Sequence, residues 1–171
     1  ETIRSVVQRT ICGLNNAHVP INQCKYELFS LAFSKEYDAL FAVGREHKWQ
    51  KRWDISNQLI ENSILCIPND IMPTDGKNIQ YRQLESIAKS FGISESILPR
   101  SEIGGHIYSV VKARNDIAHG NKTPKEVGRE TSISDMQIRL SCVREECDYV
   151  IDVYERYLTT QQYLRPSALD I

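Results

Sequence analysis

The chain has 171 residues, with 21 Lys and Arg against 22 Asp and Glu and a formal net charge of −1. A composition that is 41% hydrophobic and 25% charged is that of a folded globular protein, and the length suits one domain with an ordinary core. The near-neutral charge argues against a protein that coats DNA by bulk electrostatics, and no apolar run is long enough to cross a membrane.

The cysteine pattern favours free thiols in a reducing, cytoplasmic setting. The five cysteines are Cys12, Cys24, Cys66, Cys142 and Cys147. Their odd number and the absence of a Cys-x-x-Cys pair argue against a disulfide framework or a zinc site, and we expect no metal and no cofactor. The N-terminus lacks the features of a signal peptide and an initiating Met, which leaves open a longer parent protein.

The first third of the chain has helical periodicity. Residues 2–15 carry apolar side chains at helical spacing and predict a helix. From residue 22 to 52 the pattern predicts one long helix or two in series. Its apolar stripe, which we expect to be covered, consists of Phe29, Phe33, Tyr37, Leu40 and Phe41. A further helix over 54–66 is expected to turn Leu59, Ile60 and Ile64 inward.

The remaining elements are also helical. A loop over 67–77 contains two prolines, and a helix over 78–91 ends at Gly92. The next helix runs over 101–119, with Gly120 directly after its end, and residues 123–132 are expected to form a loop. A long last helix covers 134–163. Strand patterns are nearly absent, so we predict an all-α fold: one helical bundle of about five to seven helices over 1–171, with its core over 22–160.

The segment 112–120, with sequence KARNDIAHG, stands out. The helix predicted here has an apolar stripe that begins before this segment and continues into it, formed by Ile103, Ile107, Val110 and Ile117. Arg114 falls on the same stripe. A guanidinium there is costly unless an anionic or hydrogen-bonding group meets it. His119 lies five residues after Arg114, about 140° around a helix, whereas Asn115 shares the face of His119. Arg114 and His119 therefore meet only if the helix ends and lets His119 turn, or if a second protomer supplies half of the site.

This segment resembles the signature of HEPN domains (higher eukaryotes and prokaryotes nucleotide-binding). In that signature an Arg is followed after four to six residues by a His, often with a polar residue directly after the Arg. Arg114, Asn115 and His119 match it. The string Arg-Asn-Asp-Ile-Ala-His-Gly is similar to the RiboL-PSP type of prokaryotic conflict and defence systems, and the order of helices fits this type over about residues 22–160.

The resemblance implies a metal-independent endoribonuclease that acts as a homodimer, with the motif helices of two protomers facing each other. The 2′-hydroxyl of the RNA would attack the neighbouring phosphate and leave a 2′,3′-cyclic phosphate. An unperturbed histidine can exchange a proton at neutral pH, which suits His119. Arg114 would hold the phosphate and stabilise its charge in the transition state, and Asn115 would orient the His or a phosphate oxygen.

Local charge supports an anionic ligand. Residues 112–129 carry five basic and two acidic side chains in a chain of net charge −1. Besides Arg114, the basic residues are Lys112, Lys122, Lys125 and Arg129, which we expect to bind the RNA substrate. Such an enzyme would serve as a toxin or an antiviral-defence effector, with an antitoxin or a fused sensor domain as a further partner and no role for a membrane.

Two other functions remain open. The first is a catalytically silent HEPN-like module that dimerises and binds RNA or a nucleotide. The second is the toxin partner of a small nucleotidyltransferase, which modifies a Tyr after the motif His; here Gly120, Asn121 and Lys122 follow His119, which weakens this interpretation. Near the basic run at residues 45–52, stacking of Trp49 and Trp53 on bases is possible, but the pattern favours packing in a core or an interface.

Overall fold

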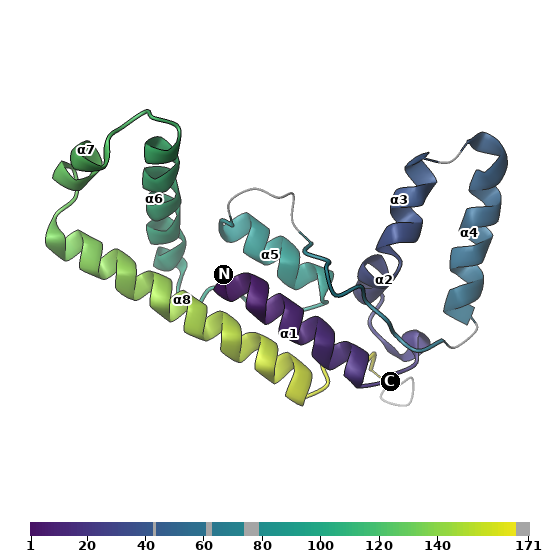
Figure 1. Cartoon of the computed structure of the whole chain (residues 1–171). Coiled ribbons are helices and arrows are strands. Elements are labelled where there is room, and N and C mark those ends of the chain that lie inside the picture. The colour runs from purple at the N-terminus through teal and green to yellow at the C-terminus, as the bar shows by residue number, and fades with distance from the viewer. Residues whose placement is uncertain (43, 61–62, 74–78, 167–171) are drawn as a thin grey trace. The chain divides into compact units, whose positions relative to one another are not determined.

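A computed structural model describes residues 1–42, 44–60, 63–73 and 79–166. These residues contain eight α-helices and one short 3-10 helix, and no strand beyond two isolated pairs of bridging residues, which confirms the all-α prediction (Figure 1). The helices are α1 (Thr2–Asn16), α2 (Glu27–Ala32), α3 (Ser34–Ala42), α4 (Arg45–Ile60), α5 (Tyr81–Ser90), α6 (Ser101–Ala118), α7 (Pro124–Arg129) and α8 (Ile133–Thr159), and the 3-10 helix is η1 (Ile21–Gln23).

The chain divides into two compact units. The first unit comprises Glu1–Pro73, Ile87–Ser94 and Tyr154–Ile171, and the second comprises Thr74–Ser86 and Glu95–Val153. In the first unit, α1 buries Val7, Ile11 and Leu14, which lie four and three residues apart on one face. The sequence predicted this helix to within a residue. The prediction that 1–171 forms a single domain stays a prediction.

Polar contacts fix the extended segments of the first unit. The side-chain amide of Asn15 donates to the carbonyl of Ile67 at 2.8 Å and accepts from its N–H at 2.8 Å. These two hydrogen bonds satisfy the backbone carbonyl and N–H of Ile67, which lies in neither a helix nor a sheet. In the same unit, the buried Tyr157 hydroxyl donates to the Phe91 carbonyl at 2.7 Å, and the two rings pack edge to face.

The second unit contains α6, α7 and most of α8. Ile97, Ile103 and Val150 are among its buried apolar side chains. Arg100 directly before α6 forms an ion pair with Glu145 on α8, and the Tyr149 hydroxyl donates to the Ser96 carbonyl at 3.0 Å. Both contacts link the chain before α6 to α8.

The prediction that other parts of the chain cover the apolar stripe of residues 22–52 is wrong beyond Phe33. The chain forms three helices there instead of one or two, and Phe33 is buried at the end of α2. Further along, Tyr37 is exposed, Leu40 is half-buried and Phe41 is 88% exposed, and α3 has no buried residue. Periodicity indicates that a stripe exists but does not say whether anything covers it.

The helix expected over 54–66 is displaced. The structure instead has α4 over Arg45–Ile60, followed by extended chain in which Leu65 and Ile67 are buried. Ile60 and Ile64, expected to face inward, are both exposed, and the side chain of Leu59 lies outside the described residues. The expected loop over 67–77 is present as far as residue 73, and its remainder also lies outside them.

The prediction of a loop over 123–132 is also wrong, because α7 forms there. Thr123 caps this helix through the N–H of Glu126, and the Glu126 side chain accepts from the N–H of Thr123 at 2.7 Å. Pro124 occupies the first helical position, where its missing N–H costs nothing. The sequence Thr-Pro-Lys-Glu carries this capping-box signal, so the helix could have been predicted.

Candidate functional site

The motif lies at the C-terminal end of α6, where the chain leaves the helix by a Schellman motif. The N–H of Gly120 bonds to the Ile117 carbonyl at 3.1 Å, and that of Asn121 bonds to the Asp116 carbonyl at 2.8 Å. Gly120 has φ +72°, in the left-handed region that glycine adopts without strain. The predicted end of the motif helix at Gly120 is therefore confirmed, with His119 as the C-cap residue.

Replacing Gly120 with Ala should destabilise the protein by about 1 kcal/mol, because a side chain is strained at this positive φ. No atom lies within 4 Å of the added methyl group, so backbone strain is the whole effect. Chemical denaturation of the two proteins measures the difference. Gly128→Ala is the matched control, because it also adds a methyl group in open space and has no positive φ to strain. An equal stability of Gly120→Ala and the parent would show that the helix end is not fixed as described.

The helix geometry continues through His119. Its N–H bonds to the Asn115 carbonyl at 2.9 Å, the ordinary α-helical pattern, and the positive φ comes only at the next residue. His119 is thus held about 140° around the helix from Arg114. The sequence left two ways for these side chains to meet: a turn of His119 at the helix end, or a second protomer that supplies half of the site. The geometry argues against the first.

Asn115 contacts the Arg of the motif. The Arg114 Nη1 donates to the Asn115 Oδ1 at 3.1 Å, and Arg114 is exposed while Asn115 is half-buried. The expectation that Asn115 orients His119 or a phosphate oxygen stays a prediction; the bond seen here joins Asn115 to the guanidinium of Arg114. Arg114 also does not lie on a covered stripe, because its neighbours Val110 and Ile117 are exposed.

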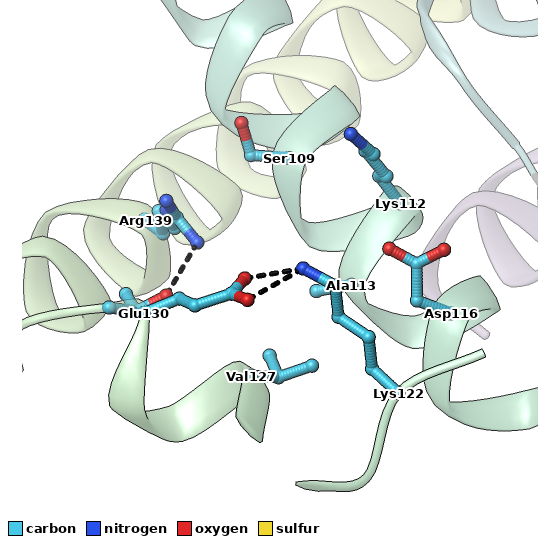
Figure 2. A pocket seen from close by; sticks show the side chains of 9 residues that line it. Ser109, Lys112, Ala113, Asp116, Lys122, Val127, Glu130 and Arg139 are labelled. Carbon is cyan, nitrogen blue, oxygen red and sulfur yellow. Dashed lines mark hydrogen bonds and ion pairs between the residues drawn. The ribbon is translucent and has the colours of Figure 1, made fainter. Parts of the chain in front are cut away.

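The side of α6 that faces α7 and α8 lines a pocket of about 190 Å³ (Figure 2). Ser109, Lys112 and Asp116 reach it from α6, at helical spacing. Lys122, Glu130 and Arg139 line it from the rest of the unit. Of the predicted binding residues, Lys112 and Lys122 therefore come together here. Arg114, Asn115 and His119 do not line this pocket, and neither do Lys125 and Arg129, which are exposed on α7.

Glu130 already holds one of these cations. The Lys122 Nζ contacts both Glu130 carboxylate oxygens, at 2.6 and 2.8 Å, and this hydrogen-bonded pair raises the pKa of Lys122 (Figure 2). Both side chains are partly exposed, so the pair contributes little stability. An anionic ligand would have to compete with Glu130 for Lys122.

A second pocket, of about 260 Å³, lies beside the first and shares Ser109 and Arg139 with it. His106 and Asp135 are among its lining residues. His106 is a partly exposed residue of α6, and the sequence did not assign Ser109 or Arg139 to any site. Arg139 lies beyond the segment 112–129, and only the return of α8 past α6 brings it to the pockets.

The open side of α6 lies opposite the pocket. Val111 and Ala118 are seven residues apart and share one line along this side, between the directions of Arg114 and His119. Ala118 is exposed and Val111 is half-buried. The single methyl group of Ala118 leaves room beside the helix at the level of the motif, and Val111 places an apolar side chain one heptad earlier on the same line. Arg114 lies on one flank of this line and His119 on the other.

Three further properties concern metals, thiols and membranes. Over the described ranges, no group of three or more His, Cys, Asp or Glu side chains is placed to hold a metal ion. All five cysteines are free thiols. Among the helices of the same ranges, none is both long and apolar enough to span a membrane.

Comparison with known proteins places the chain in a family. A family model described as RiboL-PSP-HEPN matches residues 1–156, which include α1 as well as the segment from residue 22 onward. No curated protein and no solved structure matches the chain.

Proposed function

The chain belongs to the RiboL-PSP-HEPN family, and on that premise we propose that it is a metal-independent endoribonuclease whose active site is completed by a second copy of the chain. HEPN domains are frequently ribonucleases of defence systems. The observation that carries the proposal is the triad of Arg114, Asn115 and His119 at the end of α6, in which the Arg and the His are exposed. The cellular role proposed with it is that of a toxin or an antiviral-defence effector in the cytoplasm.

The triad suits cleavage by the 2′-hydroxyl of the RNA itself. His119 takes the proton of the attacking hydroxyl or returns one to the leaving 5′-oxygen, and Arg114 stabilises the charge that builds on the phosphate. Asn115 holds the Arg114 guanidinium through the 3.1 Å bond to its Nη1. Because the nucleophile belongs to the substrate, the reaction needs no metal-bound water.

Helix geometry supports a composite site. Within one α6, Arg114 and His119 point about 140° apart, so one phosphate does not meet both from the same helix. If the open sides of two copies pack in parallel along Val111 and Ala118, the Arg114 of one protomer lies on the same flank of the contact as the His119 of its partner. A two-fold axis then produces two equivalent Arg–His pairs.

The pocket beside the motif provides a path for the RNA backbone. Lys112 and His119 are seven residues apart and therefore share a line on α6, so the 190 Å³ pocket opens on the side of the motif where His119 lies. Lys112 and Arg139 offer charge there for a phosphate next to the one that is cut. Lys125 and Arg129 on α7 extend the basic surface.

Incubation of the purified chain with total RNA in EDTA tests the proposed activity. We expect fragments with 2′,3′-cyclic phosphate and 5′-hydroxyl ends, and none with the His119→Ala variant. Cleavage that requires added magnesium, or fragments with 3′-hydroxyl ends, would contradict the mechanism. Binding of RNA without cleavage by either protein would favour the silent module instead.

Replacing Ala118 with Arg should break the dimer and abolish cleavage, because a long charged side chain prevents the close approach of two α6 helices. Ala118 is exposed in the protomer, so the variant should fold normally. Light scattering should give about twice the 19.7 kDa chain mass for the parent and the single-chain mass for the variant. Ser5→Arg, at an exposed position of α1, is the matched control and should stay dimeric. A parent that is monomeric at micromolar concentration while active would contradict the composite site.

A further inference from the structure

The second pocket of the α6–α8 unit, of about 260 Å³, has no part in the proposed function. Its lining residues follow each other at three- and four-residue spacing on each helix, so each helix contributes one face to it. They include Glu102, Gly105 and His106 on α6, and Asp135, Ile138 and Arg139 on α8. The pocket therefore brings acidic, basic, aromatic and apolar groups together from two facing helices.

The charges of this pocket argue against a phosphate group as its occupant. Glu102 and Asp135 place two carboxylates against the single guanidinium of Arg139. In the first pocket, by contrast, cations outnumber acids by three to two. A carboxylate repels a phosphate and accepts hydrogen bonds from N–H groups, whereas a guanidinium repels a cation and donates to oxygen and nitrogen acceptors. The second pocket therefore suits a neutral group that both donates and accepts hydrogen bonds.

Asp135 and Arg139 supply this combination from one helix. They are four residues apart on α8, which places their Cβ atoms about 5–6 Å apart on one face. The Ser132 hydroxyl donates to the Asp135 Oδ2 at 2.7 Å and lowers the pKa of Asp135, so the carboxylate is ionised and its Oδ1 can accept from a ligand. The Arg139 Nη1 donates to the Thr131 hydroxyl at 3.5 Å, and a guanidinium has several further N–H donors.

We propose that the second pocket, called the guanine pocket from here on, binds an unpaired guanine base of the RNA and so determines which RNA sequences the enzyme prefers. The N1–H and N2–H of guanine donate to the Asp135 carboxylate, and its O6 and N7 accept from the Arg139 guanidinium. The base lies between the His106 ring on α6 and Ile138 on α8. Nothing lies within 4 Å of a methyl group added at Gly105, so this glycine leaves room for the base. This inference rests on the proposed function in taking RNA as the ligand.

Guanine matches these two groups better than the other bases do. An arginine forms two hydrogen bonds to the O6 and N7 of guanine, whereas adenine carries an amino donor in place of O6. Cytosine also presents an amino donor, N4, and uracil has only one N–H for the carboxylate. A basic side chain of a protein is the competing occupant, because the pocket contains two acids. Arg139 in the same pocket repels such a cation and favours the base.

The guanine pocket is continuous with the path proposed for the RNA backbone. Ser109 and Arg139 line both pockets, so the two pockets join there and the donors of Arg139 serve both (Figure 2). The α6 residues that line the pockets form one stripe at three- and four-residue spacing, and this stripe continues to His119. His106 precedes His119 by about 20 Å along the helix axis. The bound guanine therefore lies several nucleotides away from the phosphate that is cut.

Binding of short strands that cannot be cut tests the guanine pocket. The probe is a labelled 2′-O-methyl oligouridylate, which lacks the nucleophile, with one uracil replaced by guanine, adenine or cytosine. Fluorescence anisotropy should show that the parent binds the guanine strand about 5- to 150-fold more tightly than the others. Inosine in place of guanine should lose part of this gain, because it has no N2 amino group. Asp135→Asn should lose most of the preference, because its amide has one acceptor oxygen and no charge.

Gly105→Leu tests the same pocket by filling it. The substitution places a good helix former in α6 where nothing lies within 4 Å of the new Cβ, so the variant should fold and lose the guanine preference. Gly128→Leu is the matched control, because this helical glycine also has open space around it and lines neither pocket. It should keep the preference of the parent.

Equal affinity of the parent for the four strands would overturn the proposal, as would a guanine preference that both Asp135→Asn and Gly105→Leu retain. Binding of a lysine-rich peptide that Asp135→Asn abolishes, without any preference among the strands, would assign the pocket to a protein partner instead. Failure of the two proposals is distinguishable. A guanine preference in binding without cleavage of natural RNA removes only the nuclease, whereas cleavage of RNA with no guanine preference removes only the guanine pocket.

Discussion

The Arg114→Ala and His119→Ala variants should each lose RNA cleavage by about 100- to 10,000-fold while they remain folded. That range is typical for removing a general acid or base, or a group that stabilises transition-state charge. Both side chains are exposed, so the free energy of unfolding should change by no more than about 0.5 kcal/mol. Cleavage rates on one RNA substrate, together with circular dichroism and denaturation curves, measure both effects.

Matched substitutions control for the loss of charge and of an imidazole. Arg4→Ala removes an exposed Arg from α1, and His18→Asn removes an exposed His at a positive φ that Asn tolerates. Both should cleave RNA at the parental rate. A strong loss of helical content in Arg114→Ala or His119→Ala would show instead that these residues hold the fold together.

The second large effect concerns Glu146, a carboxylate in the core of the protein. Cys142, Glu146, Val150, Val153 and Tyr157 form the buried stripe of α8. Glu146 is 3% exposed, and over the described parts of the chain neither of its oxygens has a hydrogen-bond partner. Burial, with a smaller contribution from the neighbouring Glu145, raises its pKa to about 7. The ionised form is therefore disfavoured in the folded state.

Stability should fall as the pH rises through this range. The folded protein keeps the Glu146 proton up to about pH 7, whereas the unfolded chain releases it near the ordinary value of 4.5. Between these values the folded state binds more protons, so the free energy of unfolding decreases with pH. At 1.36 kcal/mol per pKa unit, Glu146 should lower it by about 3 kcal/mol in total.

Glu146→Gln isolates this effect, because the amide has the shape of the acid and does not ionise. From roughly pH 4 to pH 8 the stability of the variant should rise by about 3 kcal/mol relative to the parent. Exposed Glu155→Gln on the same helix is the control and should show no such trend. A difference between Glu146→Gln and the parent that stays constant with pH would mean that Glu146 is solvated or paired.

The sequence predicts a helix well where apolar periodicity and the residues that mark helix ends both agree with how the helix packs. The boundaries of α1 and α6 follow from periodicity together with Asn16 and Gly120, since capping and turn residues mark helix ends. The motif residues are recognisable because the spacing from Arg114 to His119 combines with a polar residue directly after the Arg. The α7 helix had such a signal in Thr123 and Glu126, although sequence reasoning overlooked it.

What the sequence cannot give is which face of a helix is covered. Arg114 falls on an apolar stripe of α6 and is nevertheless exposed, whereas Glu146 on α8 is buried. Phe41 was expected to be covered, and Trp53 was expected to pack in a core or an interface; both are exposed in the chain. Burial depends on which elements pack against a face, and long-range contacts decide that. That Arg139 and Ser109 line the same two pockets was unpredictable for the same reason.

Mixing the two inactive variants tests the composite site most directly. In a heterodimer of Arg114→Ala and His119→Ala, the intact Arg of one protomer meets the intact His of the other. If dimers exchange freely, half of them are heterodimers with one of two sites restored, and the mixture should recover about a quarter of parental cleavage in EDTA. A mixture as inactive as either variant alone would contradict the central claim that two protomers share each active site.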